Sequence, residues 1–418
     1  MPEGVDLSAE ITALNCMINW KRVGALDLAF DWKAGNVLVT GLLTLILSGC
    51  VSTSWIAQKI VQPDSRSQAS ALWSQFAAPF YQRHITLPVA SPDAGSVEAA
   101  VIDPAHYDPE IGVIYKIGKE TVRATLNFPE LPAPPDTVAF KQLAKRNPVN
   151  AYANRLRRWL PTVREEEPVG TILMLPGFGL DKNSLISWGL FFADRGWRVV
   201  LIDLRGQGES KSSYLTWGIR DKDDLHRLVE LLRGEHILKD PWLYFGISYG
   251  AGVALMASSG TPKPDGVIAL APWANARKVI PRFGQLAGGW IAPGRNSPKW
   301  AKAEKRAGTL AGINFSDAVP IQSVPQIQAP VLYLGGTADK VATPTEIGSL
   351  SIATPDSEVK LLQGLPHMVV SVDVPGFCNT IMDWLAAKLH KSSQRPCSVR
   401  RKSVNGKVIR TTYWGNSP

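Results

Sequence analysis

The sequence has few of the residues that bind metals. Its 418 residues include four cysteines and six histidines, and these are scattered rather than clustered at the short spacings of metal ligands. A phosphate-binding glycine loop is also missing, because residues 205–209 contain two glycines but neither the lysine nor the spacing of such a loop. We therefore expect neither a metal nor a cofactor.

Acidic residues are missing from the end of the chain. After His390 there are seven basic residues and no acidic one, so this tail holds seven of the nine net positive charges. The rest of the chain is close to neutral, whereas a protein that binds nucleic acid needs a basic face on its body. We expect no nucleic-acid partner. The basic residues of the tail are Lys391, Arg395, Arg400, Arg401, Lys402, Lys407 and Arg410.

An apolar run at residues 37–47 is too short for a typical membrane span of about 20 residues. Its length suits the apolar part of a signal peptide, and it ends in Leu47-Ser48-Gly49-Cys50. This ending resembles the lipobox of bacterial lipoproteins. The resemblance implies that Cys50 becomes the diacylated mature N-terminus, which would anchor the protein to the membrane of the bacterial cell envelope, facing the periplasm.

Two other interpretations of this segment stay open. Residues 34–60 could form an uncleaved anchor in the inner membrane, or the run could be a buried core helix of a cytoplasmic protein. The stretch before the run is long and partly acidic, so translation could instead begin at Met17. Export would leave Cys378 and Cys397 as the remaining cysteines, and an oxidising periplasm would permit them to form a disulfide.

The chain divides into four regions by composition. Residues 1–50 form the signal segment, and residues 51–110, rich in Pro, Ser and Ala, are predicted to be a linker followed by irregular or partly helical structure. Residues 111–390 form the main domain, which opens with two short antiparallel strands at 111–117 and 121–127. Residues 391–418 form the basic tail, in which Asn405-Gly406 is a strong signal for a hairpin.

From residue 170 onward, apolar strands alternate with helix-length segments. This alternation predicts the α/β class, with a mostly parallel central sheet covered by helices on both faces and chemistry at the carboxyl ends of the strands. The strands are expected at 171–175, 198–204, 242–247, 267–270, 331–334 and 359–362.

A pentapeptide, Gly246-Ile247-Ser248-Tyr249-Gly250, stands between a strand and a segment of small residues. This G-x-S-x-G pattern is typical of a nucleophile elbow, in which a serine sits on a strained turn from strand to helix. Side chains at the two glycine positions would collide with the strand and the helix. We predict that Ser248 is a nucleophile.

An acid and a base follow Ser248 in the chain. Asp339 comes after the strand at 331–334, and His367 comes after the strand at 359–362. This order of Ser, Asp and His over residues 171–390 resembles the α/β-hydrolase family. The resemblance implies a catalytic triad of Ser248, Asp339 and His367. Asp317 and Asp373 are the alternative acids.

The resemblance also predicts where the oxyanion of the intermediate is bound. One backbone donor should be the amide of Tyr249, and the other the amide of Phe178 in the loop Pro176-Gly177-Phe178-Gly179. This loop has Pro176 where the family often has His-Gly. Residues 272–329 are expected to form a small lid whose aromatic residues favour an apolar acyl or aryl group.

These observations predict a serine hydrolase that cleaves a small-molecule carboxylic ester through an acyl-enzyme. A peptidase, a thioesterase or an acyltransferase of the same fold would use the same triad with another substrate or acceptor. A non-catalytic binding protein of the cell envelope is the alternative from another class of function.

Overall fold

The computed structural model describes residues 52–63, 68–89, 94–116, 119–288, 292–391, 397–404 and 408–414. Cys50 and the apolar run at 37–47 lie outside the described residues, so the predicted signal segment stays a prediction. Within the described residues, no helix is long and apolar enough to cross a membrane.

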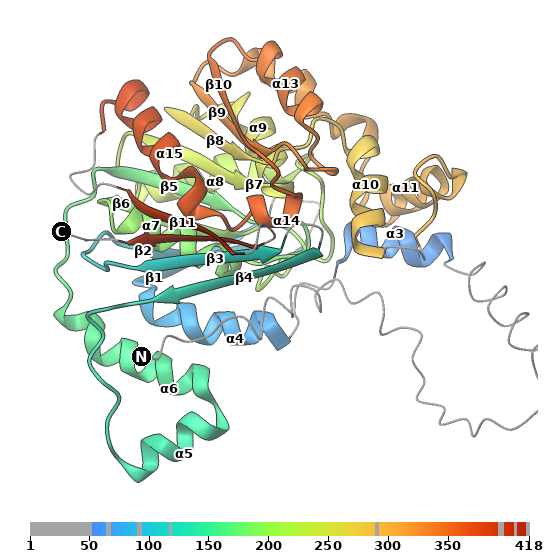
Figure 1. Ribbon diagram of the computed structural model, residues 1–418. Helices are drawn as coiled ribbons and strands as arrows, with labels where there is room; N and C mark the ends of the chain where they lie inside the picture. The colour runs from blue at the N-terminus through green and yellow to red at the C-terminus, as the bar shows by residue number, and fades with distance from the viewer. Residues whose placement is uncertain are drawn as a thin grey trace, which may run out of the picture.

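An eight-stranded sheet forms the centre of the molecule (Figure 1). The strands follow the order β1-β2-β6-β5-β7-β8-β9-β10, and the six from β6 to β10 are parallel. This confirms the predicted α/β class. The strands are β1 (Arg83–Pro88), β2 (Ser96–Ile102), β5 (Gly170–Leu175), β6 (Trp197–Asp203), β7 (Trp242–Ile247), β8 (Gly266–Leu270), β9 (Val331–Gly336) and β10 (Ser357–Leu362).

Helices cover both faces of this sheet because its central strands are apolar on both sides. In β5, Ile172 faces one hydrophobic core and Leu173 faces the other, as the period of two in a strand requires. The first core includes α7 (Ile186–Ala193) and α15 (Val374–Leu389). The second includes α8 (Asp221–Gly234), α9 (Tyr249–Ser258) and α13 (Pro344–Ala353).

The predicted linker at 51–110 is wrong in one respect. Strands β1 and β2 of this region pair with each other and β2 pairs antiparallel with β6, so both belong to the central sheet. The expected boundary between residues 110 and 111 therefore does not separate a linker from the main domain. Helix α3 (Thr53–Val61) and helix α4 (Gln68–Ala77) also lie in this region. The composition did not indicate strands β1 and β2, because short strands leave little signal in a sequence.

A second sheet joins the basic tail to the body. The two predicted antiparallel strands are β3 (Glu110–Lys116) and β4 (Lys119–Asn127), and the tail supplies β11 (Ser398–Val404) and β12 (Val408–Trp414). Strand β12 pairs with β3, so the predicted hairpin is docked on the body. A disulfide joins Cys378 of α15 to Cys397, immediately before β11.

Two helices, α5 (Val138–Arg146) and α6 (Pro148–Trp159), extend away from the central sheet (Figure 1). Helix α6 is held to the body through its buried aromatic residues. Tyr152 stacks on Phe76 of α4, with ring centroids 6.0 Å apart, and Trp159 packs on Phe128 at 5.3 Å. Helix α5 has no buried residue.

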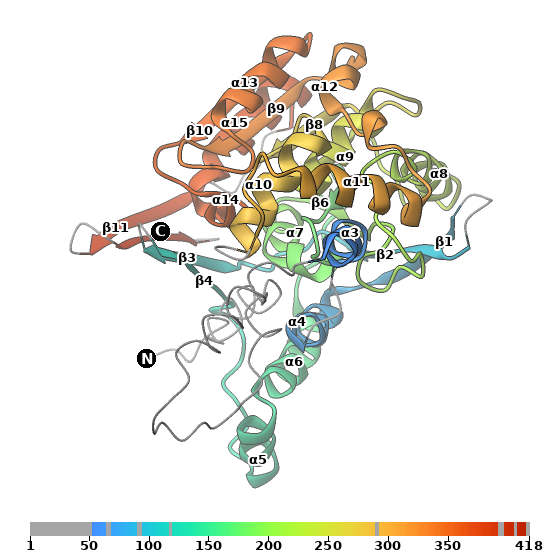
Figure 2. The same ribbon diagram turned by 90° about the vertical axis from the view of Figure 1, so that its right-hand side faces the viewer.

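The predicted lid region contains α10 (Ala276–Gly288), α11 (Pro298–Ala311) and the short α12 (Pro320–Ser323). Helices α10 and α11 lie beside the carboxyl edge of the sheet, and α3 packs against α11, as both views show (Figure 1, Figure 2). The lid region is therefore joined by a helix from the N-terminal part of the chain.

Candidate active site

Ser248 stands at a sharp turn between β7 and α9. Its backbone has φ 50 and ψ −107, a conformation that a residue with a side chain rarely adopts. Two backbone hydrogen bonds hold the turn: the amide of Ser248 donates to Leu270 O at 2.8 Å, and the amide of Gly250 donates to Pro176 O at 3.0 Å. These bonds fix the serine to the neighbouring strand and to the loop after β5.

The two glycines of the pentapeptide are required by close backbone contacts. A Cβ at position 246 would lie 2.5 Å from the Cα of Ala251, and a Cβ at position 250 would collide with the carbonyl of Leu175. In both cases the obstacle is backbone, which cannot move without disturbing the sheet. The turn therefore has the geometry that the pattern predicts for a nucleophile elbow.

The structure brings Ser248, His367 and Asp339 together. The hydroxyl of Ser248 lies 2.9 Å from Nε2 of His367, and Nδ1 of His367 lies 2.7 Å from Oδ2 of Asp339. Both of the latter side chains are buried. These contacts join residues 119 and 28 positions apart in the sequence. The arrangement allows the imidazole to accept the serine proton while the carboxylate orients it.

Asp339 is held in place by the backbone of its own loop. Its Oδ1 accepts hydrogen bonds from the amides of Val341 at 2.8 Å and Ala342 at 2.9 Å, which leaves Oδ2 for His367. The alternative acids lie elsewhere. Asp317 is exposed and bonded to Ser316, and Asp373 caps the N-terminus of α15.

His367 is the first residue of α14 (His367–Val370). This short helix is tied to the core by Trp188 of α7, whose indole Nε1 donates to Ser371 O at 2.9 Å. The contact spans 183 positions in the sequence. The sequence analysis did not predict this role of Trp188, because nothing in the local pattern of α7 indicates a contact with the segment after His367.

The two predicted oxyanion donors lie on either side of the turn. Phe178 is in the loop after β5, and Tyr249 is the first residue of α9. Within the described residues, the backbone amide of neither one donates to a protein acceptor. Such amides are available to bind an oxyanion, as the prediction requires.

Gln207 positions the loop that contains Phe178. Its Nε2 donates to Gly177 O at 2.7 Å, and the side chain is fully buried. The sequence marks residues 203–210 only as a structural turn of the family, so this particular contact was not predicted. The burial of Gln207, which indicates such a contact, is known only from the structure.

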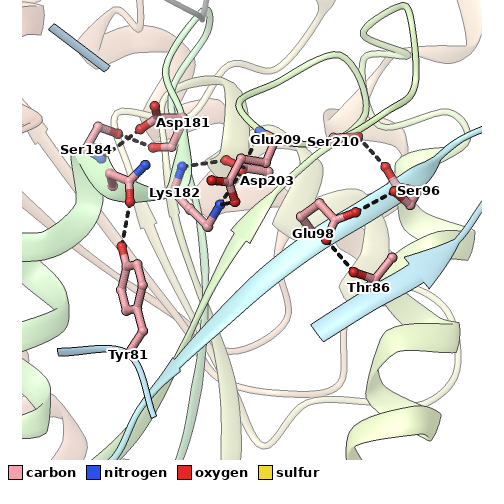
Figure 3. Close-up of polar contacts among 11 residues, drawn as sticks. Tyr81, Thr86, Ser96, Glu98, Asp181, Lys182, Ser184, Asp203, Glu209 and Ser210 are labelled. Atoms are coloured by element: carbon pink, nitrogen blue, oxygen red, sulfur yellow. Dashed lines mark hydrogen bonds and ion pairs between the residues drawn. The ribbon is translucent and has the colours of Figure 1, made fainter. Parts of the chain in front are cut away.

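A buried ion pair between Lys182 and Asp203 lies just after the loop that contains Phe178 (Figure 3). Asp203, at the end of β6, accepts hydrogen bonds from the amide of Lys182 at 2.7 Å, from Lys182 Nζ at 2.7 Å and from the amide of Glu209 at 2.9 Å. Burial opposes the charge of Lys182, but the carboxylates of Asp203 and Glu209 outweigh it and raise its pKa. Asp203 thus acts as loop scaffolding.

Three aromatic rings pack around Phe178, the predicted oxyanion donor. Its ring centroid lies 5.0 Å from that of Phe283 in α10, 5.6 Å from Trp217 and 6.2 Å from Tyr249. Trp217 in turn donates from Nε1 to Ile60 O of α3 at 3.0 Å. The lid and the N-terminal helix therefore both contact the aromatic cluster beside the elbow.

Tyr249 contributes its phenol to this cluster as a neutral group. Burial, reinforced by the nearby carboxylate of Asp221, raises the pKa of Tyr249 well above its ordinary value. Its hydroxyl accepts a hydrogen bond from the amide of Trp217 at 3.0 Å.

In the part of the chain that the structure describes, no group of three or more His, Cys, Asp or Glu residues could hold a metal.

Comparison with known proteins agrees with this fold. Residues 166–311, about a third of the chain, match the family model described as serine aminopeptidase, S33. A curated relative, an uncharacterised protein of Bacillus subtilis (strain 168) called YqkD, is 27% identical over 209 residues, which cover 48% of this chain and 65% of the relative. The chain thus spans less than two thirds of that relative.

Solved structures with a similar arrangement include several esterases. The Pyrococcus furiosus esterase Pf2001 matches with a TM-score of 0.46 and 14% identity, covering 76% of this chain and 93% of its own. A thermophilic esterase from Thermogutta terrifontis matches with a TM-score of 0.44 and 18% identity, covering 73% and 98%. These identities are too low to transfer an activity.

The sheet order, the turn after β7 and the match of residues 166–311 agree on the architecture of this protein. The chain has the α/β-hydrolase fold. The match to the serine aminopeptidase model further supports a hydrolase in general terms.

The crowding at Gly250 generates a stability prediction. We expect Gly250→Ala to lower the free energy of unfolding by about 3 kcal/mol or more, because the new methyl group would collide with the backbone of β5. Gly348→Ala in α13 is the matched control, since a Cβ there meets nothing within 4 Å and alanine favours a helix by up to about 1 kcal/mol. Urea unfolding measures both; equal stabilities would contradict the geometry.

Proposed function

We propose that this protein is a serine hydrolase that cleaves carboxylic esters through an acyl-enzyme, with Ser248, His367 and Asp339 as its triad. The observation that carries the proposal is the continuous contact from the hydroxyl of Ser248 through both nitrogens of His367 to the carboxylate of Asp339. A serine needs such a base, and the base needs such an orienting group, to become a nucleophile.

The geometry supports an ordinary two-step mechanism. Ser248 Oγ attacks the ester carbonyl while its proton passes to Nε2 of His367, and the negative charge that develops on the carbonyl oxygen is bound by the amides of Phe178 and Tyr249. The protonated imidazole then gives its proton to the leaving alkoxide. A water molecule, deprotonated by the same histidine, releases the acid and restores the serine. Asp339 stabilises the imidazolium in both steps.

The aromatic cluster supports an apolar acyl or aryl group in the substrate. The rings of Phe178, Trp217 and Phe283 lie next to one oxyanion donor and are contributed by three separate segments. Such a wall favours apolar carbon over charge, because burying apolar surface is favourable by about 25 cal/mol per Å².

An aminopeptidase is the second candidate, since the matching family model carries that description. The chemistry of the triad would be the same, but the site would need a carboxylate to bind the free amine of a peptide. A thioesterase or an acyltransferase would also use this triad, and a non-catalytic envelope protein would retain the fold without turnover.

We expect Ser248→Ala to abolish labelling by a fluorophosphonate probe and to lower kcat for aryl and acyl esters by up to about a millionfold, because the nucleophile is removed. Ser259→Ala is the matched control: this serine follows the last residue of the same helix, and its hydroxyl donates to Met256 O at 2.8 Å. The measurement is labelling, followed by rates on esters of increasing acyl length and on aminoacyl anilides.

The outcomes separate the candidates. Turnover of esters but not of anilides supports the esterase, and preferential turnover of anilides with a free amine would favour the aminopeptidase. A folded wild-type protein that neither labels nor turns over any of these substrates would leave only the binding protein.

We expect Asp339→Asn to lower kcat by about a thousandfold or more, because the amide no longer stabilises the imidazolium or selects the correct tautomer of His367. Asp317→Asn provides the control, since Asp317 is exposed and was an alternative acid by sequence alone. Steady-state kinetics on one ester measures both. An unchanged rate for Asp339→Asn together with a loss for Asp317→Asn would reverse the assignment.

We also propose that the chain is exported and anchored by lipid at Cys50. The support is the apolar run at 37–47 followed by Leu47-Ser48-Gly49-Cys50. Two acyl chains would attach the protein stably, because each buried methylene contributes about 0.8 kcal/mol.

Mass spectrometry of the mature protein is expected to find an acylated N-terminal Cys50. Cys50→Ser should prevent both the cleavage and the acylation, whereas Cys16→Ser should leave them unchanged. An intact Met1 or Met17 on the mature wild-type protein would rule out processing at this site.

A further inference from the structure

The lid region carries a strong local charge. Residues 272–329 include eight basic residues and two acidic ones, a net charge of +6. The tail after His390 accounts for seven of the nine net charges of the whole chain, so residues 1–390 have +2, and their part outside the lid region therefore has −4. The near-neutral body is thus divided between a basic side and an acidic remainder. The basic residues are Arg277, Lys278, Arg282, Arg295, Lys299, Lys302, Lys305 and Arg306.

The structure arranges part of this charge on one exposed surface. In α11, Trp300 and Ala303 turn inward and are buried, while Lys302, Lys305 and Arg306 are exposed. These three residues lie at helical spacings of three and four, so they share one face of α11, which is called the cap face below. The one acidic residue of α11, Glu304, is already paired with Arg277, whose Nε lies 2.7 Å from its Oε1.

The chain that leads to the apolar run starts at a helix that packs on α11. Helix α3 packs against α11 (Figure 2) and begins at Thr53, six residues after the run ends at Leu47. Six extended residues span at most about 20 Å, and the three residues from Cys50 span about 10 Å. Whether the run or an acylated Cys50 enters the lipid, the start of α3 must stay close to the membrane surface.

We propose that the cap face docks on an anionic lipid surface. The short tether brings this side of the molecule to the membrane, and its positive charge complements anionic head groups, whose attraction for basic residues acts within about one Debye length. The proposal rests on the membrane anchoring proposed above and does not depend on the catalytic role of Ser248.

The test measures how the full chain distributes between two vesicle populations, one of phosphatidylcholine alone and one that also contains phosphatidylglycerol. The populations are mixed and then separated by density. Because both accept the N-terminal anchor, its contribution cancels in the ratio, and the ratio reports the preference for negative charge. We expect the wild-type chain to favour the anionic vesicles by about tenfold or more at low salt, and this preference to fall as salt screens the charges.

The test variant reverses three charges of the cap face, Lys302→Glu, Lys305→Glu and Arg306→Glu. We expect its distribution ratio to fall at least about fivefold, since the reversed charges are repelled by the same head groups. Thermal unfolding of the variant, compared with the wild type, checks that the fold is retained.

The matched control reverses three exposed basic residues far from the cap face, Lys145→Glu and Arg146→Glu of α5 and Arg158→Glu of α6. It has the same net charge as the test variant and keeps the basic tail. We expect its ratio to stay close to the wild-type value. If both variants lose the preference equally, only net charge matters and the proposal is wrong.

Two further results would overturn the proposal. One is a wild-type ratio near unity, or a ratio that the cap-face substitutions leave unchanged. The other is a short DNA duplex that binds the wild type at physiological salt and loses its binding in the test variant while the vesicle ratio stays constant. That outcome would assign the cap face to nucleic acid instead.

Discussion

The site depends on the strained backbone at Ser248. A φ of 50 at a residue with a side chain is unfavourable, and the surrounding backbone compensates through the bonds to Leu270 O and Pro176 O. The same bond from Gly250 to Pro176 ties the elbow to the loop of the predicted oxyanion donor. One strained turn thus positions Ser248 and the neighbouring amides together, and it requires an ordered parallel sheet beneath it.

Buried polar side chains then hold each loop that meets this turn. Asp339 is oriented by two amides of its own loop, Gln207 fixes the loop of Phe178, and Asp203 anchors Lys182 just beyond it. A buried polar group without any partner is costly, and each of these side chains makes at least one hydrogen bond to the loop that it holds. Rigidity at the carboxyl edge of the sheet arises from these pairs rather than from the strands alone.

The N-terminal region is part of the central sheet and contacts the candidate active site. Its strands β1 and β2 extend the central sheet, and Ile60 of α3 accepts a hydrogen bond from Trp217 in the aromatic cluster of the site. The same helix packs on the lid helix α11. The turn at Ser248 is therefore flanked by three segments that contact one another: helix α3, the lid region and the loop that contains Phe178.

The sequence by itself determined the α/β class and predicted Ser248 and His367 with a choice of three acids, because strand periodicity, glycine spacing and chain order are local or ordered signals. It could not place β1 and β2, Trp188, Gln207 or Trp217, whose roles arise from contacts with distant segments. The tertiary structure alone decided between Asp339 and its rivals and set the α3 helix against the lid. Such choices depend on which side chains share space once the sheet has formed, and no local pattern encodes that proximity.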